Sequence, residues 1–397
     1  MKLPKVTIAL AIAYLVFLGT AMSADTPGVT DTEVTVGWSC PLSGPGALWG
    51  VTSLGAQAWA DHVNEKGGIH GRKIKMIVKD DAYVPSRAAA NLQEMKGQIF
   101  ALLALFGTAA SNTNKDFFFE NKMPCVLPYG NVRVWEGLPK EKRHWAFVAY
   151  PDYEDEGEYL INYAVKELGT KKVAVFIQND DYGKGGLAGV EKGLNALAGK
   201  AELAAVVPHE LAETSLGSHA FKLKESAADT VVLYTNPKHA ALISKEMVKA
   251  GYSPKRLGTF TLADPIIYSI AGETWEGTYV VLPANSGLPG TDPEANKVVD
   301  ILLSKNPKIK GKEYLGLFGA INMMHFVKGL ENAGRDLTVD SFIKGMEQIK
   351  DWNPQGVGAP VTYSPDRRHG VNGCRIGQAQ GGSVKAVTEY TIFKPRF

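Results

Sequence analysis

The chain has 397 residues, of which 45% are hydrophobic and 21% are charged, with 43 Lys and Arg against 41 Asp and Glu. Such a balanced charge argues against a protein that binds nucleic acid or an anionic membrane surface through its net charge. The length allows roughly two domains of ordinary size.

The first residues have the pattern of a secretory signal peptide. Lys2 and Lys5 precede a short apolar run, and small residues follow it. A basic start, an apolar core too short to span a membrane and a small-residue exit are typical of an export signal. We expect residues 1–23 to be cleaved near Ser23 or Ala24, which leaves a periplasmic protein with 41 basic and 41 acidic residues.

Three cysteines, Cys40, Cys125 and Cys374, are spread along the chain. An odd number leaves at least one of them unpaired in a monomer, and their wide spacing matches no zinc pattern. We expect buried free thiols, although an exported protein could form one disulfide.

The first element of the mature chain is a strand that leads into an open loop. Residues 34–39 alternate between apolar and small or polar side chains, as in a strand. Proline and glycine then break the strand over residues 41–46, and a helix follows Trp49 and ends at Gly67-Gly68. In an open α/β sheet, a loop at this end of a strand and the helix start behind it form the usual ligand site.

The alternation of strands and helices continues in two sets. Repeated βα units of this kind predict parallel sheets with helices on both faces. After residue 352, β signals dominate and predict a hairpin that turns at residues 381–383. The further expected strands cover 73–79, 100–107, 124–130, 171–180, 201–207, 230–236 and 278–283, and the expected helices include 85–99, 116–121, 319–331 and 339–349.

Evidence for catalysis is weak. Residues 183–188, GKGGLA, formally match the G-x-G-x-x-A pattern of a dinucleotide fold, which leaves a nicotinamide-dependent oxidoreductase as a remote alternative to turn glycines. The carboxylate pairs Asp80-Asp81 and Asp180-Asp181 each follow a strand, where neighbouring side chains point apart, so we expect helix capping or hinge-side solvation rather than an acid/base pair. No hydrolase or metal motif is present, so we expect a binding protein without metal or cofactor, not an enzyme.

Aromatic and small polar residues gather in the loops that follow the expected strands. Because the carboxyl ends of parallel strands meet at one edge of a sheet, we expect a cleft lined by these side chains. The residues are Trp49, Thr108, Ser111, Tyr129, Asn131 and Tyr182.

Four segments, SCPLSGPGALWG, HVNEKGGIHGRKIKMIVKDDAY, VAVFIQNDDYGKGG and IAGETWEGTYVV, closely resemble type I periplasmic solute-binding proteins of ABC importers, in the leucine/isoleucine/valine-binding branch. The resemblance implies two doubly wound parallel-sheet lobes joined by three hinge crossings. It places the N-terminal lobe at 31–149 and 284–357 and the C-terminal lobe at 150–283 and 358–397. It also implies a monomer that delivers a small solute to a membrane permease and its ATPase, with a ligand-sensing receptor domain as the alternative role.

The resemblance also implies which residues meet the solute. The implied positions are Trp49, Thr108, Ser111, Tyr129, Gly130, Asn131 and Tyr182. In amino-acid binders of this branch an acidic residue pairs with the ligand ammonium, but here Phe260 or Thr261 stands at that place and the nearest acid is Asp264. A buried ammonium without a partner is costly, so we expect an apolar or aromatic carboxylic acid ahead of a branched-chain amino acid, unless Asp264 turns inward.

Overall fold

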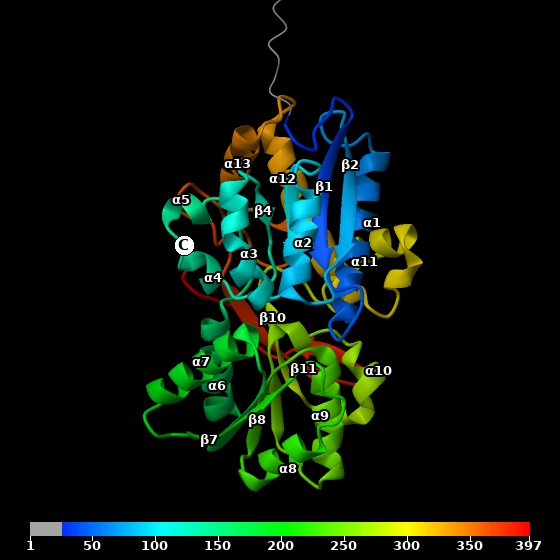
Figure 1. Ribbon diagram of the computed structural model, residues 1–397. Coiled ribbons are helices and arrows are strands. Elements are labelled where there is room, and N and C mark those ends of the chain that lie inside the picture. The colour runs from blue at the N-terminus through cyan, green and yellow to red at the C-terminus, as the bar shows by residue number, and fades with distance from the viewer. Residues whose placement is uncertain (1–25) are drawn as a thin grey trace, which may run out of the picture.

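The computed structural model describes residues 26–397, so the expected signal peptide lies outside the described residues. The chain forms two α/β lobes, one above the other in Figure 1, and each is built on its own sheet. None of the helices within 26–397 is long and apolar enough to cross a membrane. The predicted fold class of two α/β lobes is confirmed.

The first lobe contains a parallel sheet of five strands in the order β2-β1-β3-β4-β5. Its centre is β3, whose five residues are all buried, as an apolar run in a parallel sheet should be. The strands are β1 (Glu33–Cys40), β2 (Lys73–Asp80), β3 (Ala101–Leu105), β4 (Cys125–Val126) and β5 (Ala146–Phe147).

Helices cover both faces of this sheet. The helix α1 (Val51–Glu65) packs against α12 (Glu313–Ala333) so closely that a Cβ on Gly55 would lie 1.8 Å from the carbonyl oxygen of Gly316. Glycine is therefore required where the two helices touch. The other helices of this lobe are α2 (Pro85–Met95), α3 (Thr108–Glu120), α4 (Arg133–Glu136), α5 (Lys140–Arg143), α11 (Pro293–Lys305) and α13 (Val339–Glu347), with short 3₁₀ turns η1 (Ala47–Gly50), η4 (Pro307–Ile309) and η5 (Pro354–Gly356).

The second lobe contains a mixed sheet in the order β12-β11-β10-β9-β8-β6-β7, with β13 also paired to β11. The strands from β6 to β10 are parallel. Strand β11 runs antiparallel to its neighbours and adds the C-terminal strands to this edge of the sheet. The strands are β6 (Lys172–Gln178), β7 (Glu202–His209), β8 (Thr230–Tyr234), β9 (Lys255–Gly258), β10 (Tyr279–Pro283), β11 (Gly373–Gln380), β12 (Ser383–Ala386) and β13 (Thr391–Ile392). The helices are α6 (Tyr153–Glu167), α7 (Asp181–Ala196), α8 (Gly217–Glu225), α9 (Pro237–Lys249) and α10 (Ile267–Ala271), with η2 (Phe260–Leu262) and η3 (Gly272–Trp275).

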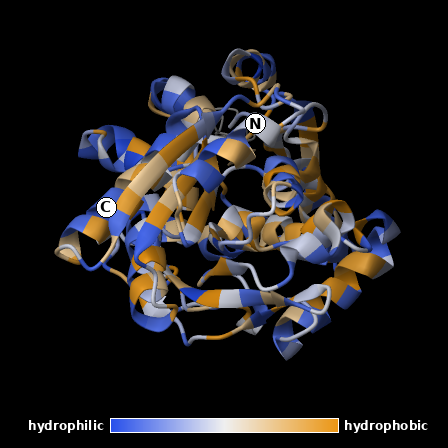
Figure 2. Ribbon diagram, turned by 90° about the horizontal axis from the view of Figure 1, so that it is seen from below, coloured by the Kyte–Doolittle hydropathy of each residue, from blue (hydrophilic) through white to orange (hydrophobic). Residues whose placement is uncertain are grey.

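The predicted C-terminal hairpin is present as β11 and β12. Gln380 pairs with Ser383, and the turn between them is Gly381-Gly382, with φ of 59° and 79°. Two consecutive positive φ angles are what a tight hairpin turn requires and what glycine allows. In Figure 2, hydrophobic and hydrophilic stretches alternate along the helices, as expected for helices that face a sheet on one side and solvent on the other. All three cysteines are buried free thiols.

Two local expectations were wrong. The helix after β3 starts at Thr108, not near residue 116, so the hydroxyl-rich TAASNTN segment is helical. The GKGG segment lies inside α7, not in a turn before it. A Cβ on Gly186 would lie 2.1 Å from the ring of Tyr234, so this glycine allows α7 to pack closely on the sheet. The segment therefore lacks the strand-to-helix turn of a dinucleotide fold.

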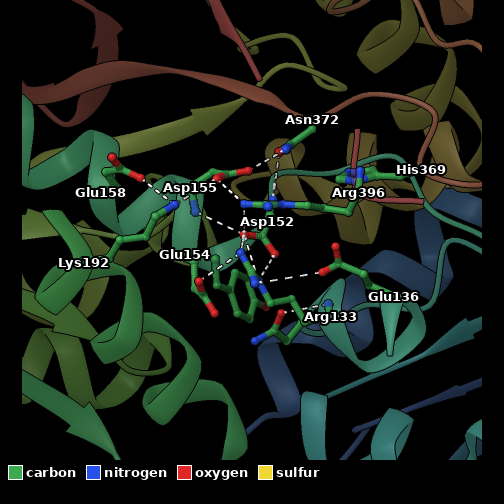
Figure 3. Close-up of polar contacts among 12 residues, drawn as sticks. Arg133, Glu136, Asp152, Glu154, Asp155, Glu158, Lys192, His369, Asn372 and Arg396 are labelled. Carbon is green, nitrogen blue, oxygen red and sulfur yellow. Dashed lines mark hydrogen bonds and ion pairs between the residues drawn. The ribbon is translucent and has the colours of Figure 1, made fainter. Parts of the chain in front are cut away.

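The chain passes between the lobes three times, after β5, after β10 and before β11. An ionic network around a buried carboxylate joins two of these passages (Figure 3). The carboxylate of Asp152, fully buried, caps α6 and accepts hydrogen bonds from Arg133 of α4 and from Arg396 near the C-terminus. The backbone N–H of Asp152 donates to Asn372 at 3.0 Å. The first and third passages are thus joined to each other and to the end of the chain.

The boundaries of the two lobes stay a prediction. Isolated bridges join Trp352 to Val361 and Val148 to His369. These contacts favour placing the third crossing between the lobes closer to residue 370 than the expected crossing after residue 357.

Candidate functional site

A cavity lies where the two lobes meet. The space between its lining atoms, with the open mouth included, is about 560 Å³. Seven of the fourteen lining residues are aromatic, and the other seven are small, apolar or neutral polar residues. The lining residues are Gly46, Trp49, Tyr83, Phe106, Gly107, Thr108, Tyr129, Tyr153, Gln178, Tyr182, Leu211, Asn236, Phe260 and Thr261.

The structure brings five of the nine expected site residues together in this lining. These are Trp49, Thr108, Tyr129, Tyr182 and Phe260. The other four, Ser111, Gly130, Asn131 and Asp264, are buried outside the lining.

The first-lobe wall is a stack of rings. Phe106 and Tyr129 lie almost parallel with their centroids 4.4 Å apart, and Trp49 lies 5.9 Å from Phe106. The hydroxyl of Tyr129 donates to the carbonyl oxygen of Phe318 at 3.2 Å, which fixes its ring. This wall offers flat apolar surfaces to a solute.

Thr108 stands at the polar end of this wall. It is the first residue of α3, and the helix begins after Gly107, whose φ of 102° suits glycine. Its Oγ1 accepts a hydrogen bond from the backbone N–H of Asn131 at 3.0 Å, so its own hydrogen is available to another acceptor. The first N–H groups of a helix have no acceptor within the helix, and like this hydroxyl they are donors of the kind that suits an anionic group.

The N–H groups that follow Tyr129 are already engaged within the protein. The N–H of Gly130 donates to the hydroxyl oxygen of Tyr150 at 3.2 Å, and the N–H of Asn131 donates to Thr108. These two N–H groups are therefore not free to donate to a solute. Ser111 lies behind Gly130, and its Oγ has no hydrogen-bond partner among the described residues.

The second-lobe wall of the cavity is formed in part by residues of α7 and η2. Asp180 caps α7 by accepting from the N–H groups of Tyr182 and Gly183, and helix capping is one of the two roles expected for the carboxylate pair Asp180-Asp181. The hydroxyl of Tyr182 lies 2.7 Å from Oγ1 of Thr261, and its ring meets that of Tyr153 edge to face. The wall therefore combines aromatic surface with a pair of linked hydroxyl groups.

A buried carboxylate, Glu156, lies directly behind this wall. Its Oε1 accepts from the N–H of Phe260 at 2.6 Å and from the hydroxyl of Thr259 at 2.9 Å. Burial raises the pKa of Glu156 to about 8, and these hydrogen bonds offset only part of that effect. Glu156 thus fixes the loop that carries Phe260 and Thr261. This role could not be predicted from the local sequence, because it depends on tertiary packing.

Asp264 faces away from the cavity. Its carboxylate accepts from the N–H of Ile266 at 2.7 Å and from the N–H of Leu315, in the first turn of α12, at 3.0 Å. Burial raises its pKa to about 6. Asp264 therefore ties a loop of the second lobe to a helix of the first, and the possibility that it turns inward is not realised.

Several lining residues were missed from the sequence. Tyr83, Phe106 and Asn236 follow β2, β3 and β8 closely, and Gln178 is the last residue of β6. The rule that identified Trp49, namely that ligands meet the loops after parallel strands, applies equally to them.

No cluster of three or more His, Cys, Asp or Glu side chains suited to a metal ion occurs in residues 26–397. A model of the family described as periplasmic binding protein matches residues 33–383. The chain belongs to this family. The predicted resemblance is therefore confirmed at the level of the family.

Among its curated relatives, this periplasmic binding protein is 26% identical over 307 residues to the Leu/Ile/Val-binding protein homolog 3 of Brucella melitensis, covering 76% of this chain and 80% of that one. Among solved structures, a fatty acid ABC transporter substrate-binding protein from Thermomonospora curvata matches with a TM-score of 0.81 and 20% identity, covering 92% and 94% of the two chains. A branched chain amino acid ABC transporter protein from Thermus thermophilus with bound valine matches with a TM-score of 0.82 and 18% identity, covering 91% and 97%. The two structures share the fold with this protein.

Proposed function

We propose that this protein captures a small solute with an apolar or aromatic body and one carboxylate, and delivers it in the periplasm to the permease and ATPase of an ABC importer. The observation that carries the proposal is the composition of the cavity lining. Among the described residues that line it, none is Asp, Glu, Lys, Arg or His, and half are aromatic. Such a lining favours a flat or branched apolar body.

The carboxylate is assigned to the start of α3. The free hydrogen of Thr108 and the first N–H groups of the helix supply donors without a buried cation. Hydrogen bonds to a charged group contribute about 1.5–3 kcal/mol each, which is enough to orient a solute.

An α-ammonium group finds no partner of opposite charge in this lining. The nearby carboxyl groups of Glu156, Asp180 and Asp264 lie outside the lining, and each accepts a hydrogen bond from a backbone N–H group of the protein. Burying an unpaired ammonium is costly, so the proposal places a carboxylic acid ahead of an amino acid. The printed names of the relatives include both Leu/Ile/Val binding and fatty acid transport, so both classes belong in the test.

The proposal is tested by calorimetry on purified protein with phenylacetate, 4-methylpentanoate and leucine. Thr108→Val removes the hydroxyl donor and keeps the shape, so it should weaken binding of the acids by about 10- to 100-fold. Thr113→Val, at an exposed position of the same helix, is the matched control and should leave binding unchanged. Equal acid binding by wild type and Thr108→Val would contradict the assignment of the carboxylate.

A further inference from the structure

Tyr83 occupies a strained part of the backbone at the edge of the cavity. It and the preceding residue, Ala82, have φ of 63° and 50°. Positive φ is rare for residues with a side chain, and two in succession carry a cost that the surrounding structure must offset. Such strain persists only where neighbouring groups fix the backbone, and it occurs preferentially at ligand sites.

The two carboxylates at the end of β2 hold this conformation. The N–H of Ala82 donates to Asp80 and the N–H of Tyr83 donates to Asp81, each at 2.9 Å. Asp81 is buried and also accepts from the hydroxyl of Ser39 at 2.8 Å, which in turn accepts from Asn91. The strained pair is therefore anchored to the interior of the first lobe.

This backbone places the ring of Tyr83 over bare backbone in the cavity wall. The lining residue beneath it, Gly107, is a glycine, and a Cβ there would lie 3.2 Å from the Tyr83 ring. Gly107 directly precedes Thr108, the residue assigned to the solute carboxylate. The ring therefore occupies the space that a side chain at position 107 would need.

The same ring lies near the second lobe. Gln178 and Tyr182 line the cavity with it. Burial, followed by the negative charge of Asp180, raises the pKa of Tyr83, and Asp180 belongs to the second lobe. Tyr83 is thus a side chain of the first lobe that closes the cavity against the end of β6 and the start of α7.

We infer that Tyr83 is a specificity-determining residue, whose ring, held by Asp80 and Asp81, limits the size of the solute around which the lobes can close. The inference rests on the proposed function for the site of binding. In a closed apolar site, one methylene more or less changes affinity by about 10- to 200-fold, so removal of a whole ring should change the size preference clearly.

The test measures dissociation constants by calorimetry for two series of rising size. One series contains 4-methylpentanoate, phenylacetate and 4-phenylbutyrate, and the other contains valine, leucine and phenylalanine. Tyr83→Gly removes the ring at a position where glycine suits the positive φ, and Tyr83→Phe keeps the ring and removes only the hydroxyl. Tyr83→Asn, which also tolerates this backbone, replaces Tyr83→Gly if the latter does not fold. Val84→Ala, at an exposed neighbour outside the lining, is the control.

In the series that binds, the ratio of the dissociation constant for the largest member to that for the smallest should fall at least tenfold in Tyr83→Gly. It should stay within about twofold of wild type in Tyr83→Phe and Val84→Ala. An unchanged ratio in Tyr83→Gly, with binding retained, overturns the inference and leaves the proposed function intact. If only the amino-acid series binds, and the ratio of its dissociation constants falls in Tyr83→Gly, the result supports the inference about Tyr83 and contradicts the proposed solute class. Absence of binding in both series overturns both.

Discussion

The buried carboxyl group of Glu156 makes the stability of the second-lobe wall depend on pH. Its side chain is fully buried, and its neighbours Thr259, Phe260 and Tyr234 are hydrogen-bond donors without positive charge. The other groups that act on its pKa are acidic or neutral, with Asp152 the charged one. The neutral acid is therefore favoured in the folded protein, and the pKa of Glu156 rises from 4.5 to about 8.

The sign of the pH dependence follows from this rise. A group whose pKa is higher in the folded state contributes stability that is complete below its unfolded pKa and is lost as the pH rises through its folded pKa. For Glu156 this window runs from 4.5 to about 8. Since each unit of pKa shift corresponds to 1.36 kcal/mol, the contribution lost across the window is roughly 5 kcal/mol.

Glu156→Gln keeps the shape and an acceptor oxygen but cannot ionise. We expect the free energy of unfolding of the variant, relative to wild type, to increase by several kcal/mol between pH 5 and pH 9. Urea denaturation followed by tryptophan fluorescence at pH 5, 7 and 9 measures the difference. Glu167→Gln, at an exposed position of the same helix, should parallel wild type at every pH. A Glu156→Gln profile that also parallels wild type would refute the reasoning.

Three further changes test two contacts between the lobes and one contact within the first lobe. Asp264→Ala removes the acceptor for one buried and one partly buried N–H group and should lower the free energy of unfolding by about 2 kcal/mol. Calorimetry should show unchanged solute selectivity, and a change in selectivity would place Asp264 in the cavity. Arg133→Met leaves the buried carboxylate of Asp152 with one fewer partner. It should lower the free energy of unfolding, measured by urea denaturation, by about 2 kcal/mol, and an unchanged value would contradict a structural role for the ionic network around Asp152. Gly55→Ala places a methyl group against the carbonyl of Gly316 and should lower the melting temperature, because overpacking costs about 1–3 kcal/mol; an unchanged melting temperature would show that α1 and α12 can separate freely.

The elements that repeat a local pattern could be predicted from the sequence. The alternation of apolar strands and helices predicted both lobes. The rule that ligands meet the loops after parallel strands predicted that Trp49, Tyr129 and Tyr182 line the cavity. The hairpin at Gly381-Gly382 was predicted because its turn chemistry is local.

The residues that depend on tertiary packing could not be predicted in the same way. Asp264 carries the same chemistry whether it faces a solute or a helix start, and only the position of α12 decides between them. Glu156 is one of several acids at the start of a helix, and its burial follows from the packing of α6 beneath η2. The start of α3 at Thr108 was missed because small hydroxyl residues favour loops locally, and burial against the sheet overrides that preference here.

In the proposed function, the cavity accepts a carboxylate and offers no partner to an ammonium group. Leucine and 4-methylpentanoate differ only in the α-ammonium, so their dissociation constants, measured by calorimetry on the same preparation at pH 7, isolate that group. Because the described lining contains no acidic side chain, we predict that 4-methylpentanoate binds at least tenfold more tightly than leucine. Tighter binding of leucine would contradict the claim.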